Sequence, residues 1–320
     1  AQVTVGTEDA RIVFAAMLYK GFLTPTSSVG VGGDYLGFDE DVHYADGFTY
    51  YTGLSMWDTF RTLHPLLVLI APDVQTDILI SMRKMQEQGG SVPKWALYTG
   101  DTGSMIGTPA DIVFADSYLK GLTDGYDVDE ILDELIEHAS GPVDAGGRQC
   151  MDRYVDLGYL PFEECGDATS RTLEYAVNDF AVAQLAAARG EDAVADELYA
   201  QSMNYLNLWN PETGFFQGMT ADGAWKDPFD PTDFADDYTE ATAWQYLWHV
   251  QHDAAGLADL MGGVDAFAQR MEEMFELTAD QEESPLPSLY YWHGNEPDIH
   301  APFMAAELGD AFHLDTALQN

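Results

Sequence analysis

The chain has 320 residues, of which 46% are hydrophobic and 12% aromatic, so it can bury a large core. Its 55 acidic residues against 13 lysines and arginines give a formal net charge of −42 at pH 7, which argues against nucleic acid and anionic membrane surfaces as partners. A secreted or calcium-binding protein would fit this charge, and so would adaptation to molar salt, where screening weakens repulsion. Because the acidic residues are spread along the whole chain, we favour the salt explanation.

No apolar run approaches the ~18–20 residues of a membrane span, and no signal peptide opens the chain. Because the first residue is Ala1, we expect a processed product or an excised piece. Cys150 and Cys165 could form one local bridge in an oxidising compartment, and the sequence alone leaves this open.

Apolar residues recur with helical spacing through most of the chain, whereas the alternation typical of strands is scarce. The first predicted helix, residues 8–22, places Ile12, Tyr19 and Leu23 on one apolar face. Another helix follows Ser55, its plausible cap, and bends or restarts at Pro65. Further helices are predicted at residues 73–88, 110–121, 127–140, 170–189, 191–208, 238–252, 254–261, 264–277 and from 301 to 308 onward.

The helices are separated by loops, among them the glycine-rich segment 29–41 and the turns at 100–107, 210–216 and 222–225. Helical hairpins with long loops at one end predict an all-α fold of the α/α toroid type, with a catalytic cleft where the loops gather. No composition shift marks a boundary, so residues 1–320 are predicted to form a single domain.

Residues 290–302, YYWHGNEPDIHAP, combine His293, Asn295 and Glu296 with three aromatic side chains. Oxygen-donating side chains suit a hard cation such as calcium, and aromatic faces suit a sugar ring. The alternative is a solvated polar loop on an acidic protein.

Residues 236–246 form the second segment of interest. Thr239 is expected to cap the helix, which would leave Glu240 in the first turn, stabilised by the helix dipole. A carboxyl group among Trp244 and neighbouring aromatics would have a raised pKa, as a general acid needs. A glycosidase requires a second carboxylate as well, about 6.5–9.5 Å away if it inverts. The alternative is a glutamate that only caps the helix.

A third constellation, Trp57, Asp58 and Arg61, offers an indole platform with a carboxylate and a guanidinium, as in a sugar subsite, or simply an ion pair at a helix start. His64, His249 and His252 are interpreted as hydrogen-bonded residues rather than zinc ligands, because no third ligand is evident. No Lys follows the glycines of 100–107 in the manner of a P-loop, and no GxSxG motif is present.

Together these motifs resemble glycoside hydrolase family 92, the calcium-dependent exo-α-mannosidases. The matching segments, in family order, are YYTGLSMWDTFRTLHPLL at 50–67, MIG at 105–107, RTLEYA at 171–176, EATAWQY at 240–246, HD at 252–253 and HGNEP at 293–297. The resemblance implies an (α/α)6 barrel and an inverting hydrolase, expected to act on α-1,2-mannosidic bonds of mannose-containing glycans.

By position, the resemblance implies that Glu240 is the general acid and that Asn295 and Glu296 hold Ca²⁺. An extracellular or periplasmic location in a high-salt environment is expected for this chain. The residues expected to contact the sugar are Trp57, Asp58, Arg61, Trp244 and His293.

Four residues depart from the family pattern: Ala241 and Thr242 replace Gly and Asn, Pro109 stands where His is common, and Tyr290 stands where Gln is common. The family's general base lies in a motif that would fall beyond Asn320, and its amino-terminal β-sandwich has no counterpart, so we expect a fragment of the catalytic domain.

Within the chain, Asp298 and the acidic loop 230–237 are the nearby candidates for a base. A chain without a base could instead bind mannosides and calcium without cleaving them, and an (α/α)6 glycosidase of another specificity is the third alternative.

The net charge of −42 predicts a fold that loosens at low ionic strength, because unscreened carboxylates repel one another. The midpoint of thermal unfolding, followed by circular dichroism, should rise steadily from millimolar to molar sodium chloride. A midpoint that is independent of salt would contradict adaptation to high salt.

Overall fold

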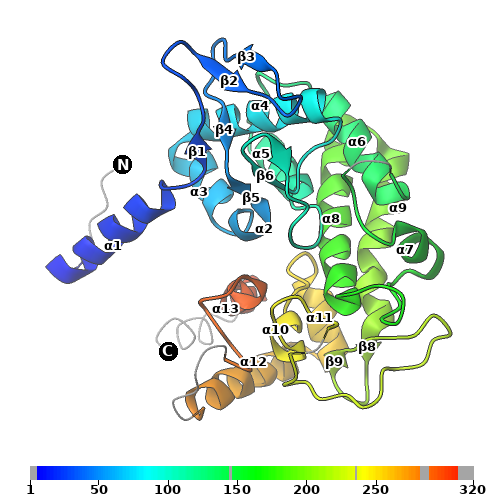
Figure 1. Cartoon of the computed structure of the whole chain (residues 1–320). Helices are drawn as coiled ribbons and strands as arrows, with labels where there is room; N and C mark the ends of the chain where they lie inside the picture. Colours follow the sequence, from blue (N-terminus) through cyan, green and yellow to red (C-terminus); the bar gives the residue numbers. More distant parts are fainter. Residues whose placement is uncertain (1–5, 144–145, 235, 282–287, 309–320) are drawn as a thin grey trace. The chain divides into compact units, whose positions relative to one another are not determined.

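The computed structural model describes residues 6–143, 146–234, 236–281 and 288–308 (Figure 1). Two compact units are distinguished, and each is described by itself. Unit 1 comprises Ala1–His138, Val143–Gly147 and Gln184–Asp192, and unit 2 comprises Ala139–Pro142, Arg148–Ala183 and Ala193–Asn320. Helices provide most of the regular structure in the described part, and its strands are two or three residues long.

Unit 1 combines helices with three small antiparallel sheets, β1–β4, β2–β3 and β5–β6–β7. The strands are β1 (Thr26–Ser27), β2 (Asp34–Leu36), β3 (Val42–Tyr44), β4 (Tyr51–Thr52), β5 (Leu54–Ser55), β6 (Trp95–Leu97) and β7 (Gly100–Asp101). The helices are α1 (Glu8–Gly21), α2 (Met56–Thr59), α3 (Leu63–Ile70), α4 (Pro72–Gly89), α5 (Ala110–Leu119) and α6 (Val128–Ser140), the last of which ends in unit 2.

Helix α4 shows how the sequence sets its own limits. Pro72 occupies the first turn, where a missing N–H costs nothing, and Gly90 ends the helix with φ 84°, a left-handed conformation that favours glycine. Ile78, Leu79 and Met82 are fully buried on one face, and each contributes about 1.5–3 kcal/mol to stability. The predicted helix 73–88 is therefore confirmed.

A buried polar chain crosses the helical part of unit 1. His64 Nδ1 donates to Gln75 Oε1 (2.9 Å), and Gln75 Nε2 donates to Ser117 Oγ (3.0 Å). Burial lowers the pKa of His64 to about 4, so the imidazole is neutral at pH 7. The chain links α3, α4 and α5, and confirms that His64 is a hydrogen-bonded core residue.

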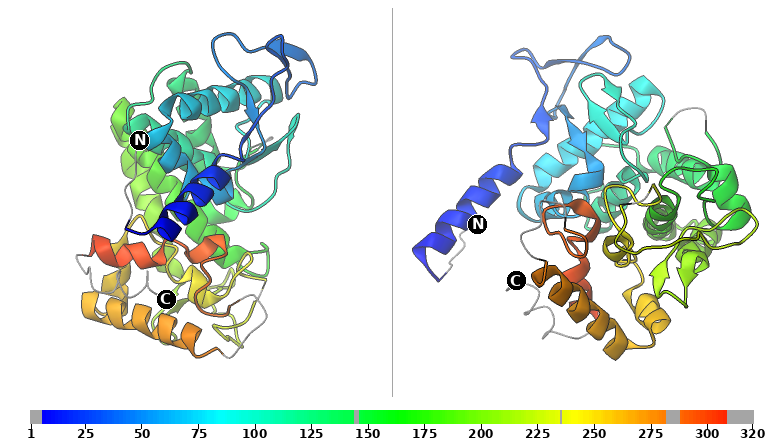
Figure 2. Two further views of the ribbon diagram at one scale, coloured as in Figure 1. Left: turned by 90° about the vertical axis from the view of Figure 1, so that its left-hand side faces the viewer. Right: turned by 60° about the horizontal axis from the view of Figure 1, so that its bottom comes forward.

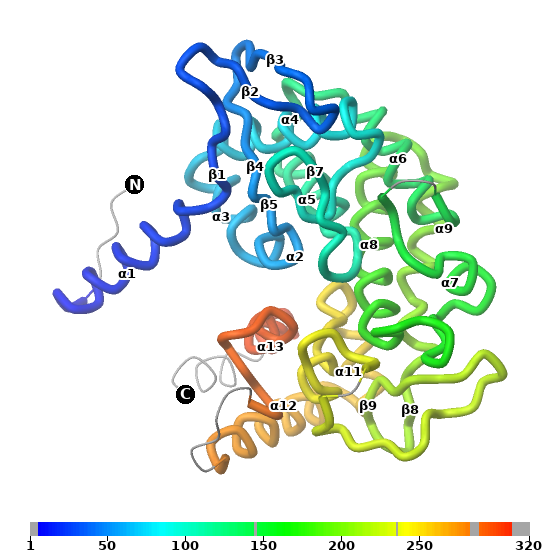
Figure 3. The backbone as a smooth tube through the Cα atoms, in the orientation of Figure 1, coloured from blue at the N-terminus to red at the C-terminus, as the bar shows by residue number. Residues whose placement is uncertain are grey.

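Helix α1 confirms the predicted helix 8–22, but its apolar face is not covered by the described residues. Ile12 is 60% exposed, Tyr19 69% and Leu23 57%, and the helix buries no residue. Figures 2 and 3 show it projecting from the rest of unit 1. The apolar face predicted from the sequence is therefore exposed in the described part of the chain.

Unit 2 contains the remaining elements. They are α7 (Met151–Leu157), α8 (Ala168–Arg189), which continues into unit 1, α9 (Asp192–Ser202), η1 (Met203–Leu208), β8 (Trp209–Asn210), β9 (Phe215–Phe216), α10 (Ala243–Tyr246), α11 (Ala254–Met261), α12 (Val264–Ala279), η2 (Glu296–Asp298) and α13 (Ala301–Glu307). Helices predicted at 170–189, 254–261 and 264–277 are confirmed. The predicted continuation of the last helix toward Asn320 lies outside the described residues.

A disulfide joins Cys150, directly before α7, to Cys165 in the segment before α8, which settles the question the sequence left open. The bridge belongs to a buried cluster with Met151, Tyr154 and Leu160. Closing a loop of this length restricts the unfolded chain, so the bridge holds α7 against the start of α8.

The predicted helix at 238–252 is wrong apart from the single turn of α10. Residues 241–250 are all buried, so this segment lacks the exposed stripe of an amphipathic surface helix. After α10 the chain turns, and Asp253 then caps α11 by accepting a hydrogen bond from Gly256 N (2.9 Å). Apolar spacing alone could not distinguish this buried, turning segment from a long helix.

Candidate active site

Glu240 is exposed and lies in a turn just before α10. Its φ of 54° places it in the left-handed region, which is uncommon for a residue with a side chain and is concentrated at functional sites. Thr242, not Thr239, is the N-cap, and it forms a capping box with Gln245, whose Oε1 accepts from Thr242 N (3.0 Å). Glu240 therefore precedes the helix. The prediction that Thr239 caps the helix and that Glu240 lies in its first turn is wrong.

Three side chains fasten this turn to residues 288–298. Thr242 Oγ1 donates to the carbonyl of Leu289 (2.9 Å), and Gln245 Nε2 donates to that of Ser288 (3.2 Å). From the other side, Asn295 Nδ2 donates to the carbonyl of Glu240 itself (2.9 Å). The two segments singled out in the sequence are thus neighbours, and Glu240 is held at both its backbone and its flanking cap.

The aromatic residues near α10 support the turn from inside. Tyr246 and Trp248 are fully buried, and Trp248 packs edge-on against Phe267 with ring centres 5.2 Å apart. Trp244 is also buried and packs edge-on against Tyr290 (5.5 Å). The expectation that these rings enclose the carboxyl group of Glu240 is therefore wrong, because that side chain is exposed.

Asn295 and Glu296 offer the oxygen atoms that a calcium site needs. Asn295 is buried. Its Nδ2 donates to the carbonyl of Glu240, so its Oδ1 is not used in this contact. Glu296 follows at the start of η2 and is half-buried. Amide and carboxylate oxygens are the donors that calcium prefers, so the chemistry fits. Among the described residues no group of three or more His, Cys, Asp or Glu side chains could hold a metal, so other ligands would have to come from backbone, water or sugar.

The rest of the 290–302 loop is held by its own polar contacts. The hydroxyl of Tyr291 and Nδ1 of His293 form a hydrogen bond (2.5 Å), and His293 is exposed. Trp292 N donates to Asp298 Oδ2 (3.1 Å), and Asp298 is fully buried. Asp298 thus closes the loop that carries Asn295.

Three histidines, His249, His252 and His300, connect the α10 segment with neighbouring elements. His249 Nε2 is 3.3 Å from the carboxylate of Glu174 on α8, and both side chains are buried. His300 Nε2 donates to the carbonyl of Trp248 (2.7 Å), and His252 Nε2 donates to that of Ser202 (3.0 Å). Burial lowers the pKa of His252 to about 4. These contacts fix α8, η1 and α13 around the α10 segment.

The predicted sugar-binding residues Trp57, Asp58 and Arg61 lie in unit 1, on and just after α2. Trp57 is 1% exposed, and the guanidinium of Arg61 lies 5.0 Å from its ring centre. Arg61 Nε also donates to the carbonyl of Trp57 (3.1 Å). Burial raises the pKa of Asp58, although a hydrogen bond from Ser55 and the charge of Arg61 oppose the shift. The three side chains form one local cluster, as their spacing indicated.

Two of the candidate bases have structural partners. Asp237 is buried and accepts from Lys226 Nζ (2.6 Å), and Asp298 closes its own loop. Asp230, at the start of the same acidic loop, is exposed and accepts from Thr232 N (2.9 Å), and hydrogen bonds from Thr232 lower its pKa. We therefore do not assign the base to Asp237 or Asp298.

The family model of the glycosyl hydrolase family 92 catalytic domain matches residues 1–312. The chain belongs to this family. The family 92 alpha-mannosidase BT3965 of Bacteroides thetaiotaomicron is similar to it with a TM-score of 0.88 and 30% identity over 98% of this chain and 42% of that one. The inverting family 92 mannosidase BT2199 of the same organism gives a TM-score of 0.85 and 30% identity over 95% of this chain and 43% of that one.

A protein described as an uncharacterized secreted glycosidase of Arthroderma benhamiae is 27% identical over 232 residues, which are 62% of this chain and 28% of the relative. The chain thus spans less than half the length of these relatives. Family 92 catalytic domains are (α/α)6 barrels, and the match to two of them over nearly the whole chain confirms the predicted all-α fold class.

Two departures from the family pattern are accommodated locally. Thr242 replaces Asn at a position that proves to be a helix cap, where both residues are favoured. Tyr290, which replaces Gln, packs on Trp244 instead of reaching out with an amide. Sequence reasoning missed the contact between Asn295 and Glu240, because nothing in the sequence indicates which backbone carbonyl a distant side chain will meet.

The structure predicts that Thr242→Val destabilises the protein by about 1–2 kcal/mol, because it removes the cap and leaves the carbonyl of Leu289 without its donor. Urea denaturation gives the free energy of unfolding. The matched control is Thr239→Val, which changes the same atoms at the position that does not cap a helix and should cost less. Equal losses in the two variants would contradict the assigned cap.

Proposed function

We propose that this chain is the catalytic portion of an α-mannosidase that removes terminal mannose from mannose-containing glycans, with α-1,2-linked mannose as the expected substrate. Membership of family 92 supports the reaction class. The observation that carries the proposal is the exposed Glu240, held before α10 by Asn295, in a chain similar to solved α-mannosidases. One solved structure of BT3965 is in complex with mannoimidazole, which supports a mannoside as ligand.

In the proposed reaction Glu240 is the general acid. Its carboxyl proton passes to the glycosidic oxygen as the bond from the anomeric carbon to that oxygen breaks, so the leaving sugar departs as a neutral alcohol. A water molecule attacks the anomeric carbon from the opposite face and loses a proton to a base, which gives β-mannose. The hydrogen bond from Asn295 Nδ2 to the Glu240 carbonyl fixes where this carboxyl group can reach.

Asn295 and Glu296 would hold a calcium ion through their side-chain oxygens. When bound, calcium supplies Lewis-acid and templating chemistry to the hydroxyl groups of the sugar. Within unit 1, Asp58 and Arg61 are proposed to contact a sugar, and the buried Trp57 to hold Arg61 in place. Within unit 2, His293 is proposed as a further sugar contact. Because Trp244 is buried against Tyr290, its contribution would be to position the α10 turn more than to stack on a sugar.

We propose a location outside the cell, supported by the disulfide between Cys150 and Cys165, since such bonds persist in oxidising compartments, and by the secreted glycosidase among its relatives. In the described part of the chain, no helix is long and apolar enough to span a membrane.

Replacement of Glu240 by Gln should lower the rate of hydrolysis of α-1,2-mannobiose roughly 10²–10⁴-fold, because the acid's proton is lost while shape is kept. Proton NMR in molar salt follows the reaction and reports the configuration of the released mannose. For an aryl α-mannoside with a good leaving group, the same substitution should lower the rate of hydrolysis much less, because such a leaving group needs little protonation. Glu276→Gln, an exposed glutamate on α12, is the matched control and should leave the rate unchanged.

Unchanged hydrolysis in Glu240→Gln would remove Glu240 from the mechanism. Binding of mannobiose by the wild-type chain without any release of mannose would favour a mannoside-binding function instead. Release of α-mannose as the first product would contradict inversion.

Calcium should raise the midpoint of thermal unfolding of the wild-type chain, and Glu296→Gln should abolish most of this increase, because a ligand that binds the folded state stabilises it. The measurement is made in molar sodium chloride, so that non-specific binding of calcium to the acidic surface is screened. Glu276→Gln, with the same loss of one charge, should retain the increase. Equal behaviour of the two variants would contradict a calcium ligand at Glu296.

A further inference from the structure

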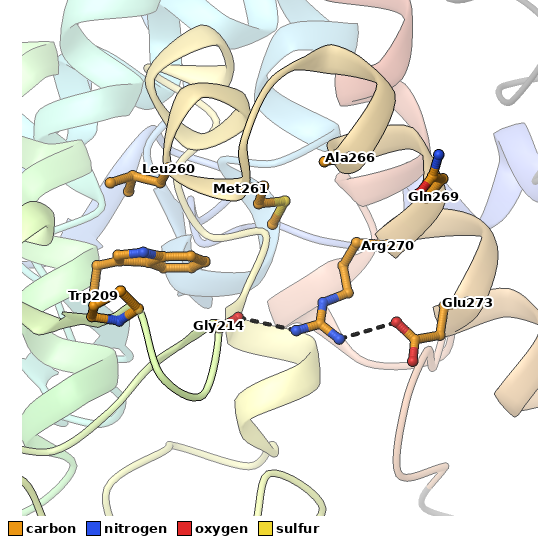
Figure 4. Close-up of a pocket in the computed structure, with 9 residues that line it drawn as sticks. Trp209, Gly214, Leu260, Met261, Ala266, Gln269, Arg270 and Glu273 are labelled. Carbon is orange, nitrogen blue, oxygen red and sulfur yellow. Dashed lines mark hydrogen bonds and ion pairs between the residues drawn. The ribbon is translucent and has the colours of Figure 1, made fainter.

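A cavity of about 340 Å³ opens in unit 2, within the range of small-ligand sites (Figure 4). One wall is the turn between β8 and β9, and the other consists of the end of α11 and the first half of α12. The lining combines an indole and several smaller apolar side chains with an amide, a guanidinium and a carboxylate. The residues on which the argument rests are Trp209, Leu260, Met261, Gln269, Arg270 and Glu273.

Trp209 provides a fixed aromatic surface. Its ring packs edge-on against Phe216, with ring centres 5.4 Å apart, which sets its orientation. Figure 4 shows the indole and the guanidinium of Arg270 on opposite sides of the cavity, with Leu260 and Met261 beside the indole. An aromatic face in a partly apolar cavity is suited to the C–H face of a sugar ring.

Arg270 is held in place before any ligand binds. Its Nη1 donates to Glu273 Oε2 (3.0 Å), and its Nη2 donates to the carbonyl of Gly214 (3.3 Å). Its guanidinium lies 4.7 Å from the ring centre of Phe215 and 4.9 Å from that of Trp244. A donor fixed on two rings and two acceptors loses little freedom on binding, which favours affinity.

The charges select the class of ligand. Arg270 and Glu273 neutralise each other at the cavity, so neither a cation nor an anion finds an unbalanced opposite charge there. The net charge of −42 further disfavours an anion. A purely apolar ligand would remove water from the guanidinium, carboxylate and amide without replacing its hydrogen bonds. A neutral polyol with one apolar face meets all of these conditions.

We propose that this cavity is a second carbohydrate-binding site, which takes one pyranose unit of a glycan between Trp209 and the Arg270–Glu273 pair. The choice of a mannoside as its sugar rests on the proposed function. Because Arg270 stacks on Trp244 of α10, the site adjoins the helix that follows Glu240, and a longer glycan held there would add affinity without taking part in bond cleavage.

The test uses the whole chain with Glu240→Gln, which should not consume the sugar, and adds α-1,2-mannotriose. Hydrogen exchange read by mass spectrometry should show sugar-dependent protection of peptides covering 209–216 and 260–273. In this background Glu273→Ala should raise the sugar concentration needed for half-protection of these peptides by on the order of tenfold, since a charged hydrogen-bond partner is lost. Protection of peptides covering 238–246 and 288–300 should not change.

Glu272→Ala is the matched control: it removes an identical exposed side chain from the neighbouring position of α12, outside the cavity lining, and should leave protection intact. Trp209→Leu is a second, independent variant that should also weaken binding.

Absence of protection at 209–216 and 260–273 up to the solubility limit of the sugar would overturn the proposal, as would equal protection in the Glu273 and Glu272 variants. The readout is binding and not hydrolysis, so it separates the two proposals. Mannose release by the wild-type chain without protection at the cavity would overturn only the second site. Protection without release would overturn only the hydrolase.

Discussion

Three hydrogen bonds from side chains to backbone carbonyls hold the Glu240 turn against residues 288–298, and the candidate site depends on them. Thr242, Gln245 and Asn295 are the donors, and the accepting carbonyls belong to Leu289, Ser288 and Glu240. A residue with φ of 54° and an exposed side chain would not keep one orientation by itself, because the left-handed region is sparsely populated for L-residues. The surrounding contacts determine the backbone, and the backbone aims the carboxyl group.

The same turn is supported from its buried side. Trp244 packs against Phe215 and Tyr290, with the guanidinium of Arg270 stacked on it, while Tyr246 is fully buried beneath. Aromatic rings in edge-to-face contact bury much area in a defined geometry, so they stiffen a segment that has only one turn of helix. This cluster also connects α10 with the cavity beside α12, so one set of side chains serves both proposed carbohydrate sites.

The many acidic residues and the few buried polar pairs affect different parts of the protein. The acidic residues set the behaviour of the surface in salt, whereas specific pairs determine the interior: Glu174 with His249, and His64 with Gln75 and Ser117. Buried histidines with a pKa near 4, such as His64 and His252, stay neutral at pH 7 and serve as hydrogen-bond donors. A polar residue that is conspicuous in the sequence can therefore have a structural role instead of a catalytic or binding role. Only its contacts in the folded protein distinguish the two.

By itself the sequence determined the helical class, the limits of helices such as α4 and α11, and the segments that carry Glu240 and Asn295, because helix period, proline, glycine and motif order are local properties. The tertiary structure alone decided that Thr242 and not Thr239 is the cap, that residues 241–250 turn through the core, and that Asn295 meets the carbonyl of Glu240. It also decided the pairing of Cys150 with Cys165 and the meeting of Trp209 with Arg270 across one cavity. The physical reason is that spacing along the chain records which face of an element is apolar, whereas burial on all sides and contacts between distant segments arise only when the elements pack.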